Sequence, residues 1–126
     1  MHKIFKDSRG CLFPIEINSI PFDIQRIFTV YGAPADTVRG EHAHFETEQY
    51  LFCIRGRIEV YLDDGVKVET TVLTEGESIF IDKLVWDSQK FLTDNDILVV
   101  FSNTNYDPDD YITDKEHFYN IIKNKY

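Results

Sequence analysis

The sequence predicts an all-β domain, an antiparallel sandwich or barrel, with one short helix near its C-terminal end. Short runs of β-branched and aromatic residues recur along most of the chain, and Gly, Pro, Asn or Asp residues separate them. Strands at this close spacing are typical of small sandwiches and barrels. The pattern changes near the end, where apolar residues recur at helical spacing.

The length and composition support one domain that covers residues 1–126. A chain of 126 residues is long enough for one hydrophobic core and too short for a second. Hydrophobic residues make up 43% of the chain and charged residues 28%, so there is ample apolar material for that core. We expect the chain to fold alone or as a small oligomer.

The first expected strand is RIFTVY, residues 26–31, which is rich in β-branched and aromatic residues and is followed by Gly-Ala-Pro. QYLFCI, residues 49–54, is a continuous apolar run of the kind that forms a buried strand. Residues 57–73 give the clearest hairpin, because apolar and more polar side chains alternate before Asp64 and Gly65, which supply the turn.

Three further strands and a helix complete the expected order. The strands are ESIFI, the short segment QKFLT and DILVVFSN, residues 77–81, 89–93 and 96–103. Thr113 and Glu116 have the spacing of a capping box, which marks the start of a helix. The apolar residues that follow at helical spacing are Phe118, Ile121 and Ile122.

Charge, hydropathy and cysteine content exclude several classes of protein. The formal net charge of −9 argues against a nucleic-acid partner, because such binding depends on neutralising phosphates with Lys and Arg. No run reaches the roughly 18 apolar residues of a membrane span, and the N-terminal sequence lacks the apolar segment of a signal peptide. We therefore expect a cytoplasmic protein without a membrane partner. Cys11 and Cys53 lack nearby partners in the sequence, which argues against a disulfide framework.

A pair of histidines marks the candidate site. In the stretch RGEHAHFETEQYLFCIRG, His42 and His44 lie two residues apart on an extended segment, so both side chains point to one face and Ala43 points to the other. If that face is the barrel interior, the two imidazoles share one cavity. The spacing from His44 to Gln49 and Gly56 is that of the first cupin motif, in which two histidines and a glutamate bind a metal ion.

Two of the metal ligands of a cupin are missing from this pattern. Gln49 stands where the first motif has glutamate, and Asp87 stands where the second motif, aligned with GESIFIDKLVWDS, ends in a third histidine. Gln is a poor, neutral ligand, so two strong ligands and one displaced carboxylate remain. We therefore predict a site with no resident metal ion and no other cofactor.

Several motifs in the same order resemble one family of cupins over nearly the whole chain. The segments DSRGCLFPIEINSIPFDIQRIFTVYG, RGEHAH followed by Gln49, LDDG, VW and SNTNYDPDDYITDKEHF are similar to those of the dTDP-4-keto-6-deoxyhexose 3,4-ketoisomerases of bacterial deoxysugar pathways. In that family Gln is usual at the position of Gln49. The chain departs from the family pattern at Asp87, where His commonly follows Trp86, and at residues 45–48, where a Lys-rich stretch is usual.

The resemblance implies a jelly-roll isomerase that needs no metal and acts on a dTDP-linked keto-sugar, in pathways that supply lipopolysaccharide and O-antigen sugars. It also implies a homodimer in which the N-terminal strands, about residues 1–30, are exchanged. An exchange of this kind would cover strand edges that are otherwise exposed.

The implied reaction gives the histidines a role without a metal. Moving a carbonyl from C4 to C3 requires removal of the C3 proton, formation of an enediol and return of a proton to C4. Imidazole suits such transfers, because its unperturbed pKa lies near neutrality. We expect His44 to act as the base and His42 to donate to, or orient, the enediol oxygens. The opposite order stays open, since sequence alone does not give the geometry.

Three residues near the histidines are expected to bind substrate. Arg39 suits bidentate contacts with the sugar or pyrophosphate, although a solvated strand-end charge would have the same sequence. Gln49 either points into the cavity or bridges backbone groups. Asp87 either replaces the missing imidazole as a hydrogen-bond acceptor or marks an altered substrate.

Four more residues complete the predicted substrate-binding set: Tyr31, Trp86, Asn103 and Tyr106. The aromatic residues are either core side chains or substrate partners, with a tyrosine donating a proton or hydrogen bond and the rings stacking on thymine. The acidic run at residues 107–110 is expected to be a solvated turn.

Two other functions stay open from the sequence. A sugar-nucleotide epimerase also removes a proton beside a ketone, but it needs its base and acid on opposite faces of the ring. A catalytically silent cupin that binds a sugar nucleotide is the second, and Asp87 is the feature that supports it.

Overall fold

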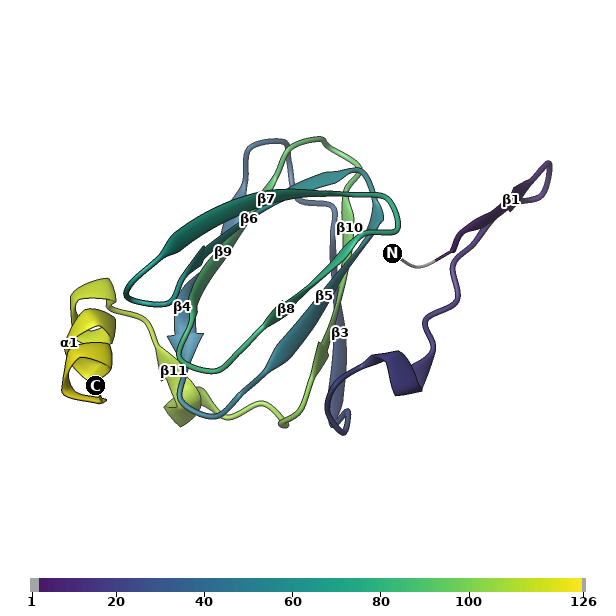
Figure 1. Cartoon of the computed structure of the whole chain (residues 1–126). Coiled ribbons are helices and arrows are strands. Elements are labelled where there is room, and N and C mark those ends of the chain that lie inside the picture. The colour runs from purple at the N-terminus through teal and green to yellow at the C-terminus, as the bar shows by residue number, and fades with distance from the viewer. Residues whose placement is uncertain (1–2, 126) are drawn as a thin grey trace.

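Two facing antiparallel sheets form the body of the protein, in a computed structural model that describes residues 3–125 (Figure 1). One sheet has the strand order β3-β10-β5-β8, and the other has the order β11-β4-β9-β6-β7. A separate two-stranded sheet, β1-β2, lies near the N-terminal end, and one helix, α1, lies near the C-terminal end. The predicted all-β sandwich with a C-terminal helix is confirmed.

The elements follow one another along the chain with short connections. The strands are β1 Phe5–Asp7, β2 Gly10–Leu12, β3 Arg26–Tyr31, β4 Val38–His44, β5 Gln49–Arg55, β6 Arg57–Asp63, β7 Val68–Thr74, β8 Ser78–Ile81, β9 Trp86–Phe91, β10 Ile97–Ser102 and β11 Tyr111–Ile112. The helices are the 3₁₀ turns η1 Ile17–Ser19 and η2 Pro108–Asp110, and the α-helix α1 Lys115–Lys125. None of the helices in the described range is long and apolar enough to cross a membrane.

Most predicted strands occur where the sequence pattern placed them. β3 has the predicted bounds, and β6 and β7 form the predicted hairpin, in which Arg57 pairs with Thr74 and Asp63 with Val68. β9 differs, because it begins at Trp86, three residues before the predicted segment. Its first residues pair with both β4 and β6, so hydrogen bonds from two neighbours extend a strand whose own sequence carries a weak signal.

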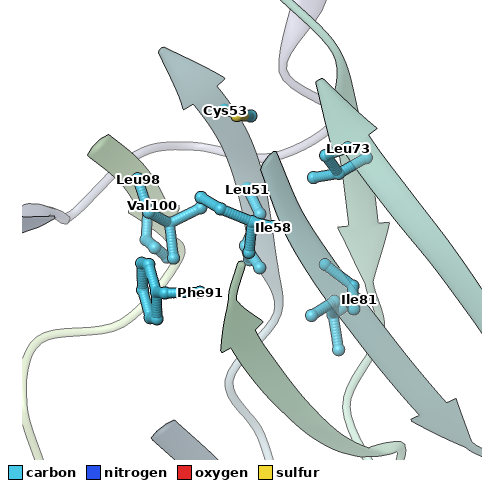
Figure 2. Packing of buried hydrophobic residues seen from close by; sticks show 9 residues of the cluster. Leu51, Cys53, Ile58, Leu73, Ile81, Phe91, Leu98 and Val100 are labelled. Carbon is cyan, nitrogen blue, oxygen red and sulfur yellow. The ribbon is translucent and has the colours of Figure 1, made fainter. Parts of the chain in front are cut away.

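The main core fills the space between the two sheets. Its side chains point inward from both sheets and meet across the sandwich (Figure 2). The buried members of this cluster are Leu51, Cys53, Ile58, Val60, Leu73, Ile81, Phe91, Leu98 and Val100. The alternation of apolar residues along the hairpin strand β6 therefore has the role that the sequence predicted, and Cys53 is a buried free thiol.

Helix α1 packs on the outer face of the sheet that contains β4 and β9. Phe118 and Ile122 of the helix pack with Ala43 and Trp86 in a second apolar cluster. The predicted capping box is wrong by one residue, because the side chain of Asp114, and not of Thr113, accepts hydrogen bonds from the first-turn N–H groups. Either residue type can cap a helix, and the path of the chain after β11 decides which one does.

The N-terminal segment has two parts, one packed on the sandwich and one that extends away from it. Residues 13–24 pack apolar side chains against the outer face of the β3-β10-β5-β8 sheet, around the buried Phe52 and Phe101. Before them, β1 and β2 form a hairpin that extends away from the two sheets (Figure 1). Leu12 and Ile17 on this segment are more than half exposed in the single chain.

Candidate active site

A β-bulge in β4 decides where the side chains of this strand point. The register with β9 pairs Gly40 and His42 with consecutive residues and leaves Glu41 as an extra residue. Gly40 and Glu41 have positive φ angles of 84° and 59°. As a result, Arg39 and His42 line the same cavity, although residues three apart on a regular strand face opposite sides.

His42 and His44 meet inside the sandwich, as the sequence predicted. Their ring centroids are 4.8 Å apart, while Ala43 between them packs on the outer face against α1. Tyr111 of β11 is the cross-strand partner of His44. Its ring centroid lies 5.1 Å from that of His42 and 4.6 Å from that of His44, so three rings form one cluster.

Burial keeps both imidazoles neutral at physiological pH. Desolvation, helped by the neighbouring His42 and Arg26 and opposed by Asp110, lowers the pKa of His44 to about 4. Desolvation also lowers the pKa of His42, against a hydrogen bond with the backbone of Gly40. Each imidazole therefore has an unprotonated ring nitrogen that can accept a proton.

His42 lies at a cavity of about 290 Å³ between the two sheets. Its lining combines apolar core side chains with a polar set formed by Arg26, Arg39, His42, Gln49, Gln89 and Tyr111. His42 lines this cavity, whereas His44 is only 4% exposed and is not among the lining residues. The geometry thus favours His42 for direct contact with a ligand, the reverse of the order that we preferred from the sequence.

Two arginines give the cavity a positive character in an acidic protein. Arg26, at the start of β3, and Arg39, on β4, both line it. Neither guanidinium forms an ion pair with another residue in the described part of the chain. Guanidinium groups without a carboxylate partner are well suited to bind phosphate oxygens.

Asp87 lies on β9 opposite His42 and is 1% exposed. Its Oδ1 accepts a hydrogen bond of 2.6 Å from Nε2 of Gln89, while Oδ2 has no partner among the described residues. Burial raises the pKa of Asp87 to about 7, and the Gln89 hydrogen bond opposes this rise. One potential donor atom each from His42, His44 and Asp87 lie within 4.8 Å of one another. Among the described residues, these three form the group that could hold one metal ion.

The other predicted site residues divide into two groups. Gln49 is 7% exposed and lines the cavity, whereas Tyr106 is 63% exposed and is not among the lining residues, although its ring lies 5.4 Å from the guanidinium carbon of Arg26. Trp86 points away from the cavity and packs on α1, with its ring 5.9 Å from that of Phe118. Tyr31 is 73% exposed and is not among the cavity-lining residues.

Asn103 forms hydrogen bonds with the backbone of the loop after β4. Its side-chain oxygen accepts a hydrogen bond of 2.8 Å from the N–H of Glu48, and its own N–H donates to the carbonyl of Glu48 at 3.2 Å. These contacts attach the end of β10 to the loop that follows the histidines. The structure therefore places Asn103 beside the site rather than among the cavity-lining residues.

The acidic run is only partly the solvated turn that we expected. Asp107 and Asp109 are exposed, but Asp110 is 9% exposed. Its carboxylate accepts hydrogen bonds from the N–H groups of Glu46 and Thr47 and from the Thr47 hydroxyl. Asp110 therefore fixes the loop that leaves β4 directly after His44.

Sequence reasoning missed the polar side chains of Arg26, Gln89 and Tyr111, which line the cavity. Arg26 points to the same inward face as Phe28 and Val30 in the predicted strand. Strand alternation could therefore have placed Arg26 in the cavity. Gln89 lies two residues after Asp87 on the same strand, and Tyr111 lies in SNTNYDPDDYITDKEHF, one of the segments that resemble the family.

The comparison with known proteins identifies the family. A family model described as "FdtA: WxcM-like, C-terminal" matches residues 1–123. A TDP-4-oxo-6-deoxy-α-D-glucose-3,4-oxoisomerase from Aneurinibacillus thermoaerophilus is 34% identical over 118 residues, which cover 92% of this chain and 85% of the relative. The chain belongs to the sugar-nucleotide 3,4-ketoisomerase family.

Solved structures of the 3,4-ketoisomerases agree with this assignment. A 3,4-ketoisomerase from Helicobacter canadensis has a TM-score of 0.86 and 31% identity over 97% of this chain and 93% of its own. QdtA, a sugar 3,4-ketoisomerase from Thermoanaerobacterium thermosaccharolyticum solved with TDP, has a TM-score of 0.87 and 30% identity over 99% of this chain and 93% of its own. The fold is the cupin jelly-roll predicted from the sequence, and the protein is an isomerase.

Epimerases are more distant from this ketoisomerase. The RmlC epimerase of Mycobacterium tuberculosis has a TM-score of 0.75 at 18% identity, over 87% of this chain and 64% of its own. At that identity the likeness concerns the fold alone. The epimerase alternative thus has weaker support than the ketoisomerase function.

We predict that replacing Asp110 with Ala lowers the free energy of unfolding by roughly 2–4 kcal/mol, because three buried or half-buried donors lose their acceptor. Urea denaturation measures this change. Asp109→Ala is the matched control, because this neighbouring carboxylate is exposed. Equal midpoints for the two variants would contradict the proposed role of Asp110 in fixing the loop.

We also predict that the contribution of Asp87 to the free energy of unfolding decreases as the pH rises from about 4 to about 7. Its pKa is about 7 in the folded protein and near 3.8 when unfolded, so between these values the folded state holds a proton that the unfolded state has lost. Raising the pH through this window therefore removes stability, by up to ~4 kcal/mol. Asp87→Asn lacks this effect.

Thermal unfolding of parent and Asp87→Asn between pH 4 and 8 checks this prediction. The melting temperature of the variant minus that of the parent should increase with pH and level off above about pH 7. The lowered pKa values of the two histidines act in the opposite direction, but both proteins contain these groups. A difference that is constant across the range would show that the carboxyl group is not held protonated.

Proposed function

We propose that the protein converts a dTDP-4-keto-6-deoxyhexose into its 3-keto isomer, without a metal ion, by proton transfer through His42 and His44. The observation that supports this most directly is the pair of neutral, adjacent imidazoles beside a cavity that two guanidinium groups without ion-pair partners among the described residues also line. A base and a phosphate-binding region are thus adjacent. We also expect the enzyme to act in the cytoplasm.

In this proposal the keto-sugar lies against His42, and the diphosphate lies toward Arg39 and Arg26. His42 takes the proton from C3, because it lines the cavity and has a free ring nitrogen. His44 and Tyr111, which contact the His42 ring, orient it, and Tyr111, which also lines the cavity, exchanges protons with the enediol oxygens. Tyr106, beside Arg26, offers a ring for the thymine base.

The decisive experiment follows dTDP-4-keto-6-deoxyglucose by NMR in deuterated water. We expect a product with the ketone at C3 and solvent deuterium at C4. An inverted or exchanged centre with the ketone still at C4 would support an epimerase. An unchanged sugar that still binds the protein would support the silent sugar-nucleotide binder, and either result would overturn the proposal.

We predict that His42→Asn lowers turnover by roughly 10²–10⁴-fold, the usual effect of losing a positioned acid–base group. TDP affinity should change little, because the diphosphate and base bind elsewhere. His44→Asn should also slow turnover but should leave more deuterium exchange at C3 than His42→Asn does. The matched control is His117→Asn, because His117 is exposed on α1. If both site variants stay folded and turn over at the control rate, the catalytic assignment is wrong.

We further propose that the enzyme is a homodimer in which the N-terminal segment packs on the partner. In the single chain, apolar side chains of this segment and of the sheet-edge strand β3 are exposed. The exposed fractions are 51% for Phe5, 61% for Leu12, 65% for Ile17 and 57% for Ile27. An apolar surface of this kind is typical of an interface. The predicted exchanged segment included residues 1 and 2, which lie outside the described residues.

The dimer proposal predicts a mass near twice 14.8 kDa by light scattering. Ile17→Glu should shift the protein toward the monomer, because it places a charge in the proposed interface. Val66→Glu is the control, since Val66 is 90% exposed at the tip of the β6–β7 hairpin, far from this segment in sequence. A parent protein of one-chain mass, or equal effects of both variants, would count against the dimer.

A further inference from the structure

Asp87 carries the one buried side-chain oxygen, among the described residues, that lacks a hydrogen-bond partner. A buried side-chain oxygen without a partner is costly, so its presence requires an explanation such as an ion or a water molecule. Gln89 holds the other oxygen at 2.6 Å and so fixes the direction of the carboxylate. On the neighbouring strand, the residue opposite Asp87 is His42.

The donor atoms of His42, His44 and Asp87 are close enough to converge on one ion. Three atoms that lie within 4.8 Å of one another all lie within about 2.8 Å of a common point, so ligand distances near 2.1 Å require each to move inward by about 0.7 Å. Side-chain rotation can provide such a shift without moving the strands. The Gln89 hydrogen bond to Asp87 has the role of the outer partners that orient metal ligands.

We propose that His42, His44 and Asp87 form a binding site for a divalent transition-metal ion, and that this ion inhibits the enzyme. Two imidazoles and one carboxylate are a donor set for ions such as Zn²⁺ and are a poor set for Mg²⁺, which prefers oxygen ligands. Gln49 does not contribute a negative charge, so three donors hold the ion, and water completes its coordination from the side of His42, the one of the three that lines the cavity.

The inhibition follows from the proposed function, on which this part of the inference rests. A metal ion binds the same ring nitrogen that must accept the proton from C3, so a loaded site lacks its base. Binding of the metal, by contrast, needs no substrate and can be measured whether or not the isomerase activity is confirmed.

Equilibrium dialysis of chelator-treated protein against Zn²⁺ tests the site. We expect one Zn²⁺ ion per chain and no comparable binding of Mg²⁺. Replacing Asp87 or His44 with Asn removes a direct ligand. Either change should therefore weaken Zn²⁺ binding by more than the ~10- to 100-fold that loss of an outer hydrogen-bond partner costs. The controls Asp82→Asn and His117→Asn change exposed residues and should bind as the parent does. Melting curves establish that the site variants are folded.

Isomerase assays with added Zn²⁺ test the inhibition. Activity of the parent should fall as the site fills, should return with chelator, and should be protected by substrate. Asp87→Asn should need at least tenfold more Zn²⁺ for the same fractional loss. Zn²⁺ binding that survives both site substitutions, or that is lost in a control variant, would overturn the site, and full activity of the loaded enzyme would overturn the inhibition.

Discussion

The β-bulge at Gly40 and Glu41 is the constraint on which the site depends. A side chain at position 40 would place its Cβ 2.9 Å from Oε1 of Gln89 and 3.2 Å from the carbonyl oxygen of Asp87, so glycine allows β4 to lie close against β9. The extra residue reverses the strand parity. Arg39 before it and His42 after it thereby face the same cavity.

The two faces of β4 and β9 have separate tasks that support each other. The inward face carries His42, His44 and Asp87, while the outward face packs Ala43 and Trp86 on helix α1. Apolar packing on the outside therefore fixes the strands that position the reacting groups inside. Burial then gives these groups their chemistry, since it favours the neutral form of both the imidazoles and the carboxyl group.

The charge of this protein illustrates how local and overall electrostatics differ. A net charge of −9 is unfavourable for binding a long polyanion such as nucleic acid. A diphosphate is short, however, and meets the two guanidinium groups of the cavity, which have no carboxylate partner in the described structure. The same acidic chain can therefore exclude nucleic acid and still bind a nucleotide-linked sugar.

Local patterns in the sequence were sufficient for the class of fold, for most strands and for the shared face of His42 and His44, because alternation and turn residues act over a few neighbouring positions. They did not reveal that Trp86 packs on α1, that Asp110 is buried, or that Arg26 and Tyr111 join the site. These features depend on the bulge and on pairing between strands far apart in sequence. Only the assembled sheets bring such residues together and remove water from around them.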